Sequence, residues 1–204
     1  MSFAGLTRLQ QGLAALQADQ LTRRRLLLDG TQGARVTIDG RHVVSFCSND
    51  YLGLAADPAL VRAAHAALDE CGVGAGAAHL IAGHHRFHED FEAAFARFVG
   101  KPAALLFTTG YLANLGVLTA LLGRHGEVFG DKLNHASLVD AAQLSGATFT
   151  RYRHLDLAQL EAQLAKSAAQ DKLIVSDLVF SMDGDMAPVD ALLDLAERHD
   201  AWLY

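Results

Sequence analysis

The sequence has little cysteine and no excess of positive charge, and both shortages exclude classes of protein. Its 204 residues include two cysteines, Cys47 and Cys71, whose separation matches no metal-binding or redox motif. Without a disulfide framework, the expected location is a reducing cytoplasm. The formal net charge is -6 and the best basic cluster is only Arg23–Arg25, so we expect no nucleic-acid partner.

A long apolar run of the kind that crosses a membrane is also missing. The stretch from Pro102 to Gly123 carries no charge, but Thr108-Thr109-Gly110 interrupts it after a short apolar run, and Asn114 follows. A strand, a turn and a buried helix explain this stretch better than a membrane span does. We therefore expect no membrane association.

The first 50 residues predict an N-terminal helix and hairpin segment. Apolar residues at helical spacing indicate a helix over Leu6–Leu28, and Asp39-Gly40 is a strong hairpin-turn signal. Short strands are expected on either side of that turn, at 36–38 and 42–46. Beyond residue 50, Asp57-Pro58 is typical of a helix start, and that helix is expected to reach about Cys71.

Strands and helices are expected to alternate after the glycine-rich stretch 72–83 and a phenylalanine-striped helix. The expected strands are Ala103–Phe107, Glu127–Gly130, Thr148–Tyr152, Lys172–Ser176 and one that begins at Ala201. The expected helices are Tyr111–Leu122, Ser137–Leu144, Leu157–Ala165 and Val189–His199. Such alternation predicts an α/β fold, with a largely parallel sheet flanked by helices on both faces. Ligands of such sheets lie beyond the carboxyl ends of the strands.

Three loops at that edge carry side chains or backbone groups suited to a ligand. Phe107–Tyr111 contains a glycine turn and a helix start whose free amides suit a phosphate, although an ordinary strand-to-helix loop would look the same. His135, in the loop after the second of these strands, could stack on a planar ring or simply cap a helix. The run Asp177–Asp185 could build a site or be a plain turn with solvated acids.

Four motifs in this order resemble the α-oxoamine synthase family. They are Ser48-Asn49-Asp50-Tyr51-Leu52-Gly53, Thr109-Gly110-Tyr111, Asn134-His135-Ala136-Ser137 and Phe180-Ser181-Met182-Asp183-Gly184-Asp185. The resemblance runs from about Arg23 to Tyr204. It implies the fold-type I architecture of pyridoxal 5'-phosphate (PLP) transferases, with residues 51–204 forming the N-terminal part of the PLP-binding large domain.

The resemblance also assigns roles to single residues. Gly110 and Tyr111 would bind the cofactor phosphate through backbone amides, and Ser181 would hydrogen-bond the cofactor near its phenolic oxygen. His135 is the implied catalytic residue, which stacks on the pyridine ring and contacts the amino-acid substrate. Asn49 would lie near the substrate carboxylate. Arg23 would contact the acyl substrate, with Arg24 or Arg25 as alternatives.

The activity implied for the whole protein is that of a PLP-dependent C-acyltransferase acting as a homodimer. Phe180 before Ser181 and Asp50 in the first motif favour the branch that condenses L-alanine with a pimeloyl thioester in biotin biosynthesis. Branches that use glycine with acetyl or succinyl thioesters are the alternatives. CoA and acyl carrier protein both remain open as the thioester carrier.

Two groups that the family's chemistry needs have no counterpart in the sequence. The resemblance places the aspartate that pairs with the pyridinium nitrogen, and the Schiff-base lysine, beyond Tyr204. The lysines present, Lys101, Lys132, Lys166 and Lys172, lie outside the family's lysine motif. We therefore expect the 204 residues to be inactive alone, as a piece of a longer protein or as a defective copy. A non-enzymatic homologue that serves as a binding partner is the remaining alternative.

Two other motif interpretations are weaker. Gly72–Ala77 loosely resembles a dinucleotide fingerprint, but it follows a helix rather than a strand. His84, His85 and His88 with Glu89 suggest zinc, but no third ligand at a matching distance is evident, so no metal is expected. The phenylalanine stripe at positions 87, 91, 95 and 98 predicts a core face.

Overall fold

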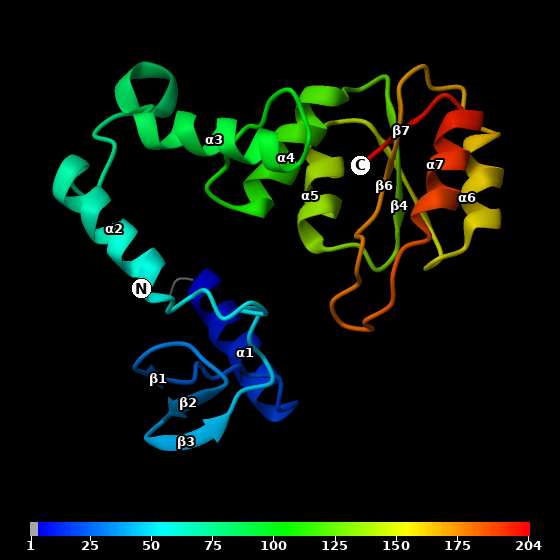
Figure 1. Ribbon diagram of the computed structural model, residues 1–204. Coiled ribbons are helices and arrows are strands. Elements are labelled where there is room, and N and C mark those ends of the chain that lie inside the picture. The colour runs from blue at the N-terminus through cyan, green and yellow to red at the C-terminus, as the bar shows by residue number, and fades with distance from the viewer. Residues whose placement is uncertain (1–3) are drawn as a thin grey trace. The chain divides into compact units, whose positions relative to one another are not determined.

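The computed structural model describes residues 4–204, and the chain divides into two units after Gly83 (Figure 1). The second unit runs from His84 to Tyr204. The sequence predicted a boundary after Asp50 instead. That boundary concerns the family's domains, and it stays a prediction. The first three residues of the predicted N-terminal segment lie outside the described part.

The first unit contains a helix, a small antiparallel sheet and a second helix. Its elements are α1 (Ala4–Ala18), β1 (Leu28–Asp29), β2 (Arg35–Ile38), β3 (Arg41–Val44), α2 (Pro58–Cys71) and a single π-helical turn, η1 (His79–Gly83). The predicted hairpin is present, because β2 and β3 pair antiparallel around Asp39 and Gly40. These two residues have φ angles of 48° and 74°, the signs that a type I′ turn requires.

Helix α2 begins as predicted, whereas α1 is shorter than predicted. The Asp57 carboxylate accepts hydrogen bonds from the amides of Ala59 and Leu60, and Pro58 occupies the first turn. The predicted Leu6–Leu28 helix ends at Ala18 instead. Gln20 adopts a left-handed conformation with φ 56°, and the Leu21 amide donates back to the Leu16 carbonyl, which ends the helix. Leu28 and Asp29 instead form β1 and pair with β2. No described helix is long and apolar enough to cross a membrane.

The second unit is built on a four-stranded parallel sheet with the order β5-β4-β6-β7. The strands are β4 (Glu127–Asp131), β5 (Thr148–Tyr152), β6 (Lys172–Val175) and β7 (Trp202–Leu203). The helices are α3 (Arg86–Phe98), α4 (Gly110–Leu121), α5 (Ala136–Leu144), α6 (Leu157–Leu164) and α7 (Val189–Arg198). Helices α4 and α5 cover one face of the sheet, and α6 and α7 cover the other (Figure 1).

Alternating strand residues supply the two cores. Val128 and Leu173 face α4 and α5, where they pack with Leu118 and Leu138. Their neighbours Phe129 and Ile174 belong to the opposite core beneath α6 and α7. Both faces of β4 and β6 are therefore buried, as expected for a parallel sheet, and the predicted α/β architecture is confirmed for these elements.

Two predictions for this unit are wrong. Residues 103–107 form no strand; Leu106 instead donates its amide to Glu92, at 2.7 Å. A strand needs a partner for its ladder, and no described strand pairs with this segment. The phenylalanine stripe of α3 is not core either, since Phe87, Phe91 and Phe95 are 44–49% exposed. Phe91 and Phe95 stack on each other, but no described segment covers them.

Candidate functional site

Two loops at the carboxyl edge of the sheet are joined by a buried asparagine. Asn134 follows β4, and its side-chain amide donates to the Val175 carbonyl oxygen at 2.8 Å. Its side-chain oxygen accepts from the Asp177 amide at 3.1 Å. The Asp177 carboxylate in turn accepts from the His135 amide at 2.6 Å. These three bonds fix the backbone of His135 relative to the end of β6.

His135 is the N-cap of α5, and its ring has a defined orientation. Nδ1 accepts from the Ser137 amide at 3.2 Å and lies 2.7 Å from the Ser137 hydroxyl oxygen. A nitrogen that accepts from an amide carries no proton, so the neutral ring is protonated at Nε2. His135 therefore does cap the helix, which was the alternative to a ligand-binding role. The exposed ring is nevertheless held at the strand edge, where it can meet a ligand.

A chain of hydrogen bonds connects Ser137, the partner of this histidine, to α4 and to Tyr204. The Asn114 side-chain amide donates to the Ser137 hydroxyl at 2.7 Å, and the Asn114 side-chain oxygen accepts from the Tyr204 hydroxyl at 2.8 Å. One turn earlier on α4, the Tyr111 hydroxyl donates to Asp140 of α5 at 2.6 Å. This hydrogen bond raises the pKa of Tyr111. The N-terminal turns of α4 and α5 are thus tied together.

The loop after β6 completes a pocket with His135. Residues 180–185 form a tight turn in which the Gly184 amide donates to the Phe180 carbonyl at 2.7 Å. Ser181 and His135 line the same pocket, which has a volume of about 220 Å³. Leu133 and Asp177 are among the other lining residues. Two residues that are 46 positions apart, and that the family resemblance assigned to one cofactor, thus line one cavity.

Gly110 does not line this pocket. It begins α4, where the Thr109 hydroxyl caps the helix by accepting from the Leu112 amide at 3.1 Å. Gly110 instead lines a separate apolar hollow together with Phe91 and Phe95. The first amides of an α-helix have no acceptor within the helix. Gly110 and Tyr111 therefore present N–H groups at the start of a helix that is tied to α5.

Arg23 and Asn49 belong to the first unit, and their predicted roles stay predictions. Both side chains are exposed, and Asn49 lies in a loop shaped by its neighbour. The Asp50 carboxylate accepts from the amides of Leu54 and Ala55, which closes the turn after the first motif. Arg24, one of the alternatives to Arg23, forms an ion pair with Asp39.

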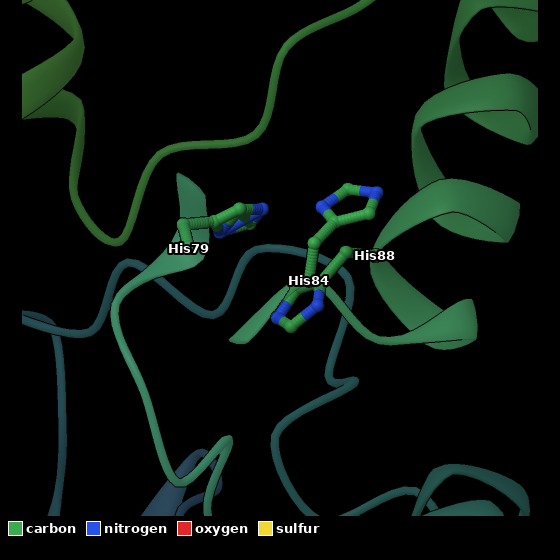
Figure 2. Close-up of side chains that lie close together, drawn as sticks. All are labelled: His79, His84 and His88. Carbon is green, nitrogen blue, oxygen red and sulfur yellow. The ribbon is translucent and has the colours of Figure 1, made fainter. Parts of the chain in front are cut away.

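The histidine-rich start of α3 gains a possible third ligand that the sequence did not suggest. The rings of His84 and His88 stack at 5.5 Å between centroids (Figure 2). The His84 Nε2 atom lies 3.1 Å from the Glu89 carboxylate, and a ligand atom of Glu92 comes within 4.8 Å of both. However, Glu92 already accepts from the Leu106 amide. The group is explained by pairing and capping at the helix start, and no metal is assigned to it.

Comparison with known proteins places this arrangement in a family. Residues 41–204 match the family model described as aminotransferase class I and II. The chain belongs to the aminotransferase class I and II family. The predicted fold-type I architecture is confirmed by a solved relative, the serine palmitoyltransferase of Sphingomonas wittichii, with a TM-score of 0.89 and 30% identity. That match covers 98% of this chain and 51% of the palmitoyltransferase.

Two curated relatives of high identity carry the same name. The chain is 78% identical over all 204 residues to the 8-amino-7-oxononanoate synthase of Thiobacillus denitrificans, and it covers 53% of that protein. It is 57% identical over 195 residues to the synthase of Nitrosomonas eutropha, covering 50% of it. A solved synthase from Francisella tularensis matches with a TM-score of 0.63 and 31% identity, over 74% of this chain and 41% of that one. The chain thus spans about half the length of the relatives that it matches.

Several supporting residues of this family member were not found from the sequence. Asn134, Asp177 and Asn114 position His135, yet none was assigned that role. Asn134 follows β4 by three residues and Asp177 follows β6 by two, so their place at the carboxyl edge was a usable signal. Asn114 lies within a helix, and no pattern in the sequence marks its partner 23 residues away.

Proposed function

We propose that the protein is an 8-amino-7-oxononanoate synthase, which condenses L-alanine with a pimeloyl thioester and releases carbon dioxide and the thiol carrier. The observation that carries this proposal is the 78% identity to a curated synthase over every residue of the chain. A binding protein without activity would not need the positioned His135 ring and its network of hydrogen bonds.

The site residues suit PLP as the cofactor. A variant of the serine palmitoyltransferase from S. paucimobilis was solved with a bound PLP–myriocin aldimine, and it matches this chain with a TM-score of 0.87 and 29% identity. The pocket offers a flat imidazole ring for stacking and the Ser181 hydroxyl as a donor to an anionic oxygen. The start of α4 offers amides of the kind that bind phosphate. When bound, PLP supplies an electron sink for the amino acid's Cα.

His135 would orient the reacting groups. Because Ser137 occupies Nδ1, the proton on Nε2 points away from α5 and is available to a substrate carboxylate or cofactor oxygen. A ring held in one plane restricts the ligand stacked on it, which favours the geometry that the reaction needs. Asp177, which fixes the His135 backbone, keeps this ring at the end of the sheet.

The remaining roles follow the family's pattern. Asn49 would bind the substrate carboxylate and Arg23 the acyl chain. A homodimer is supported by the half-exposed phenylalanines of α3, which a second copy or further chain would cover. Cys47 and Cys71 are both free, which suits a reducing cytoplasm.

The test is an assay of the protein expressed from its complete gene and loaded with PLP. We expect carbon dioxide release and a ketone product from L-alanine with pimeloyl-CoA or the pimeloyl acyl carrier protein. Glycine and L-serine, each offered with pimeloyl-CoA and with acetyl-CoA, serve as the comparison substrates. Turnover of glycine with acetyl-CoA, and none with L-alanine, would overturn the proposal in favour of a glycine-using member of the family. Failure to bind PLP would favour a non-enzymatic homologue.

A further inference from the structure

His154 connects three segments at the carboxyl edge of the sheet, outside the pocket described above. It lies two residues beyond β5, with a side chain that is 24% exposed. Its Nδ1 atom is 3.0 Å from an oxygen of Asp131, the last residue of β4. Its Nε2 atom is 2.7 Å from an oxygen of Asp185, in the turn after β6. One imidazole thus joins segments that are 23 and 31 residues away in the sequence.

Asp131 is the fixed end of this connection. Its side chain is fully buried, and its two oxygens accept from the amides of Leu133 and Leu155, each at 2.8 Å. These bonds hold the carboxylate in one orientation. A buried carboxylate is costly unless a positive partner and hydrogen bonds compensate it. Within the described part of the chain, His154 is the side chain that supplies that partner.

Asp185 is the end of this connection that belongs to the turn after β6. It closes the Phe180–Asp185 turn, because its carbonyl oxygen accepts from the Phe180 amide at 2.9 Å. The Phe180 ring is buried and meets the His154 ring edge-on, with 4.5 Å between centroids. His154 therefore holds both ends of the turn, Phe180 by packing and Asp185 by a hydrogen bond. Ser181 is carried between those two ends.

We propose that His154 is a positioning residue, which holds the Phe180–Asp185 turn to the end of β4 by donating hydrogen bonds to Asp131 and Asp185 together. Ser181 is thereby kept beside His135 on the ligand pocket. The role of Ser181 in this inference rests on the proposed function. The connection between His154 and the turn does not depend on it.

The double donation requires a protonated ring. Carboxylates only accept, so an imidazole bonded to two of them carries a proton on each nitrogen. The hydrogen bond to Asp185 raises the pKa of His154 above its ordinary value of 6.5, burial opposes the rise, and Asp131 adds to it. The charge of Asp131 also acts on Tyr152, whose pKa is raised mainly by burial, and Arg153 forms an ion pair with Asp156.

This protonation gives the connection a pH range. Because the folded-state pKa lies above the unfolded one, the stabilising contribution is complete below about pH 6.5 and is lost as the pH rises through the raised pKa. A neutral ring donates to only one carboxylate and turns a lone pair toward the other. In an Asp185→Asn variant, the new amide can donate to that lone pair. The turn would then remain attached to a neutral His154.

The experiment measures hydrogen exchange of the turn amides in the protein from its complete gene, loaded with PLP. The variants are His154→Ala, Asp185→Ala and Asp185→Asn, and the control is His125→Ala, an exposed histidine between α4 and β4. Asp185 is 39% exposed, so its variants keep the test valid if His154→Ala does not fold. Exchange is followed from pH 6 to pH 9, and the PLP dissociation constant is measured in parallel.

We expect His154→Ala and Asp185→Ala to speed exchange of the Phe180 and Gly184 amides by about tenfold or more, the effect of losing a charged hydrogen bond. The α6 amides and the control should be unchanged. Asp185→Asn should keep its protection at high pH, where the unsubstituted protein loses it. Turn exchange that is equal in Asp185→Ala and His125→Ala would overturn the proposal. Faster exchange with unchanged PLP affinity would contradict the proposed effect of His154 on Ser181. An unsubstituted protein that binds no PLP would contradict only the proposed function.

Discussion

Ser137 joins His135 to Asn114. A substitution of Ser137 therefore tests how far the orientation of the histidine ring depends on these hydrogen bonds. The hydroxyl is 1% exposed and accepts from Asn114 while it donates to His135 Nδ1. Ser137→Ala would leave the half-buried Asn114 amide without that partner. We expect a loss of about 1–3 kcal/mol of unfolding free energy, measured by urea denaturation, and weaker PLP binding.

A double-mutant cycle with Asn114→Ala controls this prediction. If the two side chains act through each other, the double variant should lose less stability than the sum of the single losses, by about 0.5 kcal/mol or more. Additive losses would contradict a shared network. The Tyr204 hydroxyl also bonds to Asn114, so Tyr204→Phe separates that contact from the one to Ser137.

The placement of site residues could be predicted from the sequence where chain order alone decides it. His135 and Ser181 follow strands of a parallel sheet, and the carboxyl ends of such strands meet at one edge. Their presence on one pocket was therefore accessible from the alternation of strands and helices. The link from His154 to Asp185 was not, because it depends on the conformation of a turn 31 residues away.

Strand β4 has little freedom, because a strand pairs with it on each side and both of its faces are buried. A Cβ at Gly130 would lie 2.8 Å from the Phe149 ring and 3.4 Å from the Asn134 side-chain nitrogen. Gly130→Ala should therefore destabilise the protein by about 1–3 kcal/mol, as overpacking does. Gly123→Ala is the matched control, since nothing lies within 4 Å of its added Cβ. Equal melting temperatures for the two variants would contradict this packing.

Elements that bury two faces or carry a cap were predictable, and those that depend on distant partners were not. The β4–α5–β5 alternation and the Asp57 cap of α2 follow from local residue patterns. Residues 103–107 have the composition of a strand, but a strand exists only where a partner supplies its hydrogen bonds. The phenylalanine face of α3 shows the same limit, because an apolar stripe predicts that a surface is covered without saying by what.

The whole chain distributes its core unevenly between the two units. Apart from Val36, the buried hydrophobic side chains of the described residues all lie in the second unit. Burial of apolar surface is the main term that offsets chain entropy. Helices α1 and α2 contain no buried residue, so little within the first unit holds them in place. Local opening should therefore cost less free energy in the first unit than in the sheet of the second.

Limited proteolysis with a protease of broad specificity would measure this difference. We expect the first cuts within 72–78, a glycine-rich and fully exposed stretch, and a resistant product that begins near His84. If the proposed homodimer also covers the first unit, these cuts should slow as protein concentration rises, while cuts in an exposed loop such as 123–125 should not. Cleavage that starts within β4 or β6 would contradict the expected order of opening. Cleavage rates at 72–78 that do not depend on protein concentration would contradict the idea that a second copy covers the first unit.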